Sequence, residues 1–180
     1  SRDYTRDITY VRGNLNGERL HVFFNHWPSR WDGDHETVSK RLAASDTILS
    51  YMNILEQEEE NPNYVIMGDF NDGPDSESIQ LLMSQKPLYN PMETLQSPHR
   101  GSAKYKGEWS IFDQILISHS FLKYAPGTHS FDQANIFDVE FLQEWKEPYK
   151  GKPFRTFVGQ KYLGGYSDHF PVYLLLNYHH

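Results

Sequence analysis

The sequence predicts a mixed α/β (α+β) domain in which a mixed sheet carries its helices on one face. The expected elements follow the order strand, strand, helix, strand, helix, loop, strand, loop, strand. Apolar residues recur at helical spacing over one long segment, and several short apolar runs end in polar loops. The chain has 180 residues with no internal repeat or linker, so we expect one domain over residues 1–180.

Composition supports a folded globular protein and limits the kinds of substrate and metal site that it can have. The hydrophobic fraction is 38%, and 15% aromatic residues supply large buriable surfaces. A net charge of −7 disfavours non-specific binding to duplex nucleic acid, which normally uses a basic face. The absence of cysteine excludes disulfides, thiolate nucleophiles and cysteine-based zinc sites. Any metal must therefore bind through oxygen or nitrogen.

Membrane insertion and targeting leave no clear sequence signal. No apolar stretch approaches the roughly 18 to 20 residues of a transmembrane helix. The polar opening SRDYTRD does not resemble a signal peptide, and a leader removed earlier would leave the same sequence. We expect a soluble protein, either cytoplasmic or extracytoplasmic.

The first expected elements are a hairpin and a long helix. Strands at 8–12 and 20–25 flank a turn at 13–17 that is rich in Gly and Asn. From 35 to 59 the apolar residues recur at helical spacing, with Asp34 as the expected N-cap and Pro62 just beyond the end.

The centre of the chain predicts a buried strand followed by a second helix. The apolar run at 64–67 leads into the polar loop GDFNDGP at 68–74, and a helix is expected at 76–83. Residues 86–107 contain Pro, Gly and Ser without periodicity and indicate a loop with short pieces of structure.

Two further strands are expected in the last part of the chain. Residues 111–118 form an apolar run with Asp113 near its start, and 170–177 are a strongly apolar closing segment. The stretch 122–166 is rich in aromatic residues, Pro and Gly, and its sequence predicts no definite element.

Four polar groupings occur at the ends or starts of these strands, where α/β proteins gather functional groups. Their two histidines, aspartates and asparagine suit a hard cation, a phosphoryl group and an activated water. The sequence contains no G-x-S-x-G, Walker A or H-E-x-x-H motif, which leaves direct attack by water as the simplest chemistry. The groupings are Asn25-His26, Gly68-Asp69-Phe70-Asn71, Asp113 and Ser167-Asp168-His169.

Each of these residues also has a structural interpretation. Asp69 and Asn71 are turn formers that bond their own backbone, and His26 could be a satisfied interface histidine. Asp113 lies in an apolar strand and needs a partner, because an unpaired buried carboxylate is costly. His169 is the expected partner.

In their order and character, the four groupings resemble motifs of the endonuclease/exonuclease/phosphatase superfamily, which has the DNase I-like fold. Residues 65–71 (VIMGDFN) resemble its apolar strand followed by G-D-[FL]-N. Residues 112–116 (FDQIL) resemble its D-x-[IVF]-[LF] strand, and residues 167–172 (SDHFPV) its terminal S-D-H-x-P-[VI]. Phe24-Asn25-His26 resembles its strand-end N/T-H motif.

The resemblance implies a four-layer sandwich and a role for each site residue. His169, oriented by Asp113, would act on the attacking water or stabilise the phosphoryl group. Asp69 would position or deprotonate the water and, with Asp168, would lie at a Mg²⁺ site that Mn²⁺ could also occupy. The remaining residues would contact phosphate: Asn71 at the scissile group and His26 at an oxygen.

Two further positions are candidates for substrate binding on chemical grounds. Arg30 follows His26 closely and could bind two phosphate oxygens at once, or it could be a solvated surface arginine. Trp109, like Trp27 and Trp31, could wall a pocket or stack on a ring, although large aromatic side chains near strand ends more often belong to the core.

The chain departs from the family pattern in its N-terminal part. The superfamily's Asn and its Q-E motif, whose Glu is the principal metal ligand, are absent, and Gln57-Glu58 lies inside the expected long helix. We therefore expect an N-terminally truncated C-terminal portion that supplies mainly one sheet with its flanking helices. Such a chain would expose an apolar sheet face and pair with the missing N-terminal half of the same protein.

These observations predict a metal-dependent phosphoric-ester hydrolase, of the phosphodiesterase, phosphatase or nuclease class, that uses activated water. Its substrate could be a small molecule, a lipid or a nucleic acid, and the acidic charge favours the first two. The alternative is a non-catalytic binding or scaffold module that retains the fold.

Overall fold

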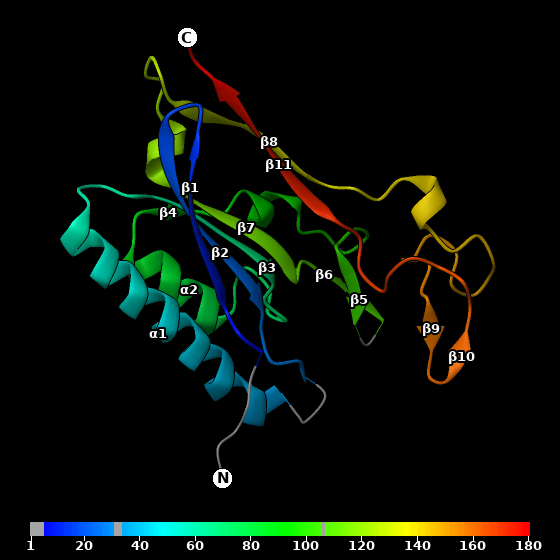
Figure 1. Cartoon of the computed structure of the whole chain (residues 1–180). Coiled ribbons are helices and arrows are strands. Elements are labelled where there is room, and N and C mark those ends of the chain that lie inside the picture. Colours follow the sequence, from blue (N-terminus) through cyan, green and yellow to red (C-terminus); the bar gives the residue numbers. More distant parts are fainter. Residues whose placement is uncertain (1–5, 31–33, 106) are drawn as a thin grey trace.

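The computed structural model describes residues 6–30, 34–105 and 107–180, without the side chains of residues 34–36 and 105. A five-stranded mixed sheet with the order β1-β2-β3-β7-β4 forms its centre (Figure 1). The strands of this sheet are β1 (Thr9–Leu15), β2 (Glu18–His26), β3 (Asn63–Asp69), β4 (Leu88–Tyr89) and β7 (Asp113–Ser118).

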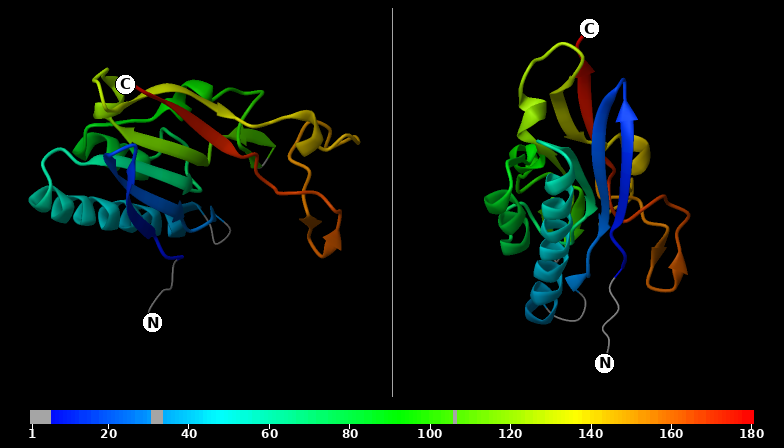
Figure 2. Two further views of the ribbon diagram at one scale, coloured as in Figure 1. Left: turned by 45° about the horizontal axis from the view of Figure 1, so that its top comes forward. Right: turned by 60° about the vertical axis from the view of Figure 1, so that its left-hand side comes forward.

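Both α-helices cover one face of this sheet, as the sequence predicts (Figure 2). Helix α1 (Asp34–Glu58) begins at the expected N-cap residue itself, and α2 is Glu77–Gln85. Side chains from both helices interlock with the sheet in a buried apolar core. Its most fully buried members are Ile48, Met52, Ile66, Phe70, Ile79, Leu82 and Leu116.

The hairpin β1–β2 has a tighter turn than the sequence predicts. Strand β1 runs on to Leu15, and only Asn16 and Gly17 connect the strands, at φ values of 49° and 90°. Two consecutive residues at positive φ are typical of a type I′ turn, which matches the twist of the paired strands.

A two-stranded ribbon lies over the other face of the central sheet (Figure 2). It pairs β8 (His129–Ile136), which the sequence left unassigned, with the predicted closing strand β11 (Val172–Tyr178). The ribbon covers β3 and β7, but Val11 on β1 remains 46% exposed and Phe24 on β2 43%. The sheet therefore keeps a partly open apolar face at its β1–β2 side.

Two short strand pairs lie beyond the end of the sheet where β2 and β3 terminate (Figure 1). Strands β5 (Ala103–Tyr105) and β6 (Glu108–Ser110) pair with each other, as do β9 (Phe157–Val158) and β10 (Lys161–Tyr162). The 3₁₀ turns that lie wholly within the described residues are η2 (Pro91–Leu95), η4 (Glu140–Leu142) and η3 (His119–Leu122), which follows β7 at the opposite end of the sheet. Neither α-helix has the length of apolar sequence that a bilayer crossing requires.

Candidate active site

Strand register brings three of the four predicted groupings together. In the parallel β2–β3 pair His26 lies opposite Asp69, and in the antiparallel β3–β7 pair Asp69 lies opposite Asp113. Gly68 permits the close approach of β2 and β3 just before the site. Its φ is 136°, and a Cβ there would lie 1.9 Å from the backbone oxygen of Asn25.

The side chains of Asp69, Asp113 and His169 converge at this strand end. His169 Nδ1 lies 2.8 Å from Asp113 Oδ2 and 3.8 Å from Asp69 Oδ2. His26 approaches the same Asp69 oxygen with its Nε2, at 3.4 Å. The His169–Asp113 pair predicted from the sequence is thus formed, and its Nδ1 contact leaves Nε2 as the ring nitrogen for chemistry.

Ser102, which the sequence did not single out, holds the two halves of this pair in place. Its fully buried hydroxyl accepts the N–H groups of Phe112 and Asp113, each at 3.1 Å. Its carbonyl accepts the N–H of Phe170 at 2.7 Å, next to His169. One serine therefore fixes the backbone on both sides of the pair. Nothing in the surrounding loop sequence distinguishes it.

Charge crowding changes the proton affinities of the converging groups. Although burial alone lowers the pKa of His169, its hydrogen bond to Asp113 and the charges of Asp113, Asp69 and Asp168 raise that pKa to about 9. Burial, followed by the charge of Asp113, raises the pKa of Asp69. Two carboxylates thus crowd the ring of His169.

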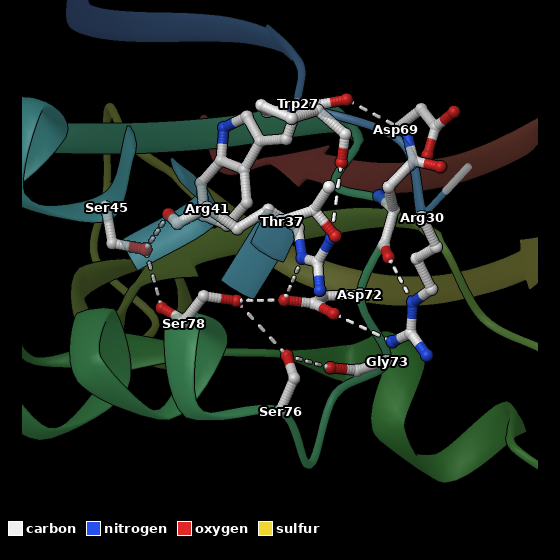
Figure 3. Close-up of polar contacts among 12 residues, drawn as sticks. Trp27, Arg30, Thr37, Arg41, Ser45, Asp69, Asp72, Gly73, Ser76 and Ser78 are labelled. Carbon is white, nitrogen blue, oxygen red and sulfur yellow. Dashed lines mark hydrogen bonds and ion pairs between the residues drawn. The ribbon is translucent and has the colours of Figure 1, made fainter. Parts of the chain in front are cut away.

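The loop after β3 is anchored through its backbone and side chains (Figure 3). Asn71 has a φ of 50°, donates its N–H to Asp69 Oδ1 at 2.8 Å, and donates its side-chain amide to the Trp27 carbonyl at 2.9 Å. Arg30 donates its Nε–H to the Asn71 carbonyl at 2.9 Å and an Nη2–H to Asp72 Oδ1 at 2.7 Å. Arg30 thus supports the loop that holds Asn71 and lies at the edge of the site.

Asp72 is the buried centre of this anchoring network (Figure 3). Its Oδ2 accepts the Ser78 hydroxyl at 2.6 Å and lies 2.7 Å from Arg41 Nε. The Arg41 contact is an ion pair without an aligned hydrogen bond, because this Nε–H has no hydrogen-bond acceptor among the described residues. Gln114 donates to the Asp72 carbonyl at 2.7 Å. The sequence offers one signal for this network: Arg41 lies on the apolar stripe of α1.

An open cleft with a volume of about 830 Å³ lies over the converging residues. Although the protein is acidic overall, several cationic side chains line this cleft beside Asp69, Asp113 and His169. Such a lining attracts anions to a site that also holds carboxylates. The cationic residues are Arg6, Arg30, Lys104 and Arg155.

The other residues predicted from the sequence lie outside the group formed by Asp69, Asp113 and His169. Asp168 is exposed on the cleft rim, outside the group of three whose ligand atoms converge among the described residues. Trp109 stacks on Phe170 and carries Lys104 Nζ over its ring at 5.1 Å, and it does not line the cleft. Trp27 belongs to the core, and Trp31 lies outside the described residues.

The donor set fits a hard divalent cation. The potential ligand atoms of Asp69, Asp113 and His169 all lie within 4.8 Å of one another. Carboxylate oxygens are the ligands that Mg²⁺ prefers, and a cation there would oppose burial and the charge of Asp113, which both raise the pKa of Asp69.

Comparison with known proteins places this geometry in a family. No curated protein matches the chain by sequence. Among solved structures, a mannosyl-6-phosphatase of Bacteroides thetaiotaomicron superposes with a TM-score of 0.53 and 17% identity, covering 90% of this chain and 52% of that one. Beta toxin of Staphylococcus aureus gives 0.54 and 15%, covering 93% and 56%.

A humanized TDP2 of D. rerio gives a TM-score of 0.55 and 14% identity, covering 94% of this chain and 60% of that one. These similarities establish the DNase I-like fold, and the chain spans about half the length of the structures it matches. The profile of the endonuclease/exonuclease/phosphatase family matches residues 1–178. The chain therefore belongs to the endonuclease/exonuclease/phosphatase family.

Proposed function

We propose that this chain carries the water-activating and phosphate-binding part of a metal-dependent phosphoric-ester hydrolase. The observation that carries the proposal is the convergence of Asp69, Asp113 and His169 at one strand end, beneath a cleft with cationic walls. Family membership supports the same class of reaction.

The geometry supports a division of roles among these residues. Asp113 orients the His169 ring through Nδ1, so that Nε2 would contact the attacking water or a phosphoryl oxygen. Asp69 is placed to position or deprotonate the water, with His26 beside it to contact phosphate. Asp69, with Asp168 at the rim, would hold Mg²⁺, which stabilises charge on the phosphoryl group when bound.

We further propose that residues outside this chain complete the metal site and cover the open sheet face. Three convergent donors among the described residues are few for Mg²⁺, which prefers octahedral coordination, and one of them is already paired with another. The half-exposed Val11 and Phe24 offer an apolar surface for a packing partner. The N-terminal half of the same protein would supply both.

The small number of convergent metal donors favours one alternative, a binding or scaffold module without catalysis. A chain with an incomplete ligand set could retain phosphate binding in the cleft and lose hydrolysis. The two functions differ in whether bound phosphoester is turned over.

The test is hydrolysis by the full-length protein with Mg²⁺, and with EDTA as control, on plasmid DNA, phosphomonoesters, inositol phosphates and sphingomyelin. Two structural relatives justify the breadth of this panel, since one is named a mannosyl-6-phosphatase and a TDP2 structure holds a single-strand DNA product. Metal-dependent release of product from at least one substrate is the expected result. Binding without turnover of any substrate would support the scaffold alternative instead.

A further inference from the structure

A second, smaller cavity opens beside the catalytic cleft. It has a volume of about 240 Å³ and shares Lys104, Arg155 and Asp168 with the cleft, so the two spaces adjoin. Val158 of β9 and Leu163, which follows β10, are among the residues that line it. We call it the side pocket.

The inner wall of the side pocket is mainly apolar. Tyr149, Pro153, Val158 and Leu163 provide this wall, and Val158 keeps 46% of its surface exposed there. Glu144 also lines the pocket, but its Oε1 accepts the N–H groups of the two residues that follow it. Oε1 therefore stabilises this turn and is poorly placed to bind a hydroxyl-rich ligand.

The pocket wall is tied to the segment that carries His169. Phe154 accepts, through its carbonyl, the N–H groups of Tyr166 at 2.7 Å and Ser167 at 3.3 Å. Gly165 packs so closely that a Cβ there would lie 2.2 Å from the Phe154 oxygen. These contacts fix the distance between the side pocket and the catalytic histidine, two residues beyond Ser167.

Cationic side chains stand at the junction of the two spaces. Lys104 and Arg155 line both cavities, and Lys152 lines the side pocket with its Nζ 4.8 Å from the Tyr149 ring centre. An anionic group at the junction would be attracted by these charges. An apolar group attached to it would then reach the apolar wall.

We propose that the side pocket binds the organic group of the substrate, and that this group is apolar and about the size of one ring. The inference rests on the proposed phosphoester function of the cleft. A cavity of about 150 Å³ is known to hold benzene, so the side pocket has room for one ring but not for a polymer. The wall chemistry selects an aryl or compact alkyl phosphoester over a sugar phosphate.

The test measures binding to the full-length protein in Mg²⁺ by NMR titration of phenylphosphonate and methylphosphonate. Both probes carry a phosphonate and neither contains an ester, so turnover does not interfere. Phenylphosphonate should bind about tenfold more tightly, because its ring is withdrawn from water. Equal dissociation constants for the two probes would overturn the side-pocket proposal.

Matched substitutions test whether the tighter binding of phenylphosphonate arises in the side pocket. Leu163→Asn should abolish the difference between the probes and leave methylphosphonate binding unchanged, since the apolar wall is altered and no charge is introduced. Tyr162→Asn changes the preceding residue, which is 68% exposed and does not line the pocket, and should leave both constants unchanged. Val158→Asn in the pocket wall is the second variant if Leu163→Asn fails to fold.

The titration also separates this inference from the function on which it rests. Methylphosphonate binding with no preference for the ring would retain the phosphate site and refute the side pocket. If methylphosphonate fails to bind while phenylphosphonate shifts the Val158 and Leu163 methyl signals, the side pocket stands and the phosphate site is refuted. If both wall variants still bind phenylphosphonate more tightly than methylphosphonate, the ring binds outside the side pocket and the proposal is wrong.

Discussion

Two carboxylates share one imidazole at the centre of the site. His169 is bound by Asp113 and lies near Asp69, and these charges raise its pKa from 6.5 to about 9 despite the opposing effect of burial. Because this pKa is raised on folding, the pairing stabilises the metal-free protein fully below pH 6.5. The stabilisation is lost as the pH rises through 9.

Asp113→Asn should lower the pKa of His169 towards its ordinary value, because the substitution removes the negative charge that the ring contacts. Ring-proton NMR of the metal-free protein measures this directly. The wild-type midpoint is expected near 9, with a clear decrease in the variant. A titration midpoint unaffected by Asp113→Asn would show that this pair does not control the ring.

Asp72 and Arg41 form a different kind of pair, because both are almost completely buried. Asp72→Ala should destabilise the protein by about 3–5 kcal/mol, since it leaves the Arg41 charge without its partner inside the core. Urea denaturation provides the measurement. Arg19→Ala, which removes a half-exposed partner of Glu59, is the control and should cost about 1 kcal/mol or less.

Replacing both Arg41 and Asp72 tests whether the unpaired Arg41 charge is what destabilises Asp72→Ala. The double variant Arg41→Met with Asp72→Leu should be more stable than Asp72→Ala, because the buried Arg41 charge is removed together with its partner. Equal destabilisation by Asp72→Ala and Arg19→Ala would mean that the buried charge is solvated in some other way.

At the scale of elements, the approach of β2 and β3 depends on Gly68. Gly68→Ala should force the strands apart beside Asp69, because the new Cβ would overlap the backbone oxygen of Asn25 and φ is 136°. We expect a loss of stability of at least about 1–3 kcal/mol, together with weaker phosphonate binding. Gly73→Ala is the matched control, since a Cβ there meets nothing within 4 Å. Similar stability losses in the two variants would contradict this role.

Most elements that follow a local pattern could be predicted from the sequence. The helix at 35–59 and the strand at 64–67 have clear periodicity or a continuous apolar run, and both form within a few residues of the expected bounds. Strand β8 could not be predicted, because its sequence HSFDQANI lacks regular alternation and is stabilised by pairing with β11. Pairing partners far apart in the chain leave no local signal.

The candidate site was predictable to a similar degree. His26, Asp69, Asp113 and His169 stand at strand ends, where sequence pattern and strand register agree. Ser102 acts through backbone hydrogen bonds that any loop serine could make, so only the folded chain identifies it.

At the scale of the whole molecule, two features relate to function: where the charges lie, and how far each face of the central sheet is covered. The chain has a net charge of −7, yet cations gather around the cleft, which composition alone does not indicate. Helices cover one sheet face, whereas the β8–β11 ribbon covers only part of the other (Figure 2). Both features favour an anion-binding protein that packs against a further structural layer.

The most direct test of the central claim compares His169→Ala with His119→Ala in the full-length protein, on the substrate that gives metal-dependent turnover. His119 lies exposed on η3, away from the cleft, and controls for the loss of a histidine. We expect His169→Ala to reduce kcat by about 100-fold or more with little change in thermal stability, and His119→Ala to retain full activity. Wild-type turnover by His169→Ala would contradict the assignment of the Asp69, Asp113 and His169 group as the catalytic centre.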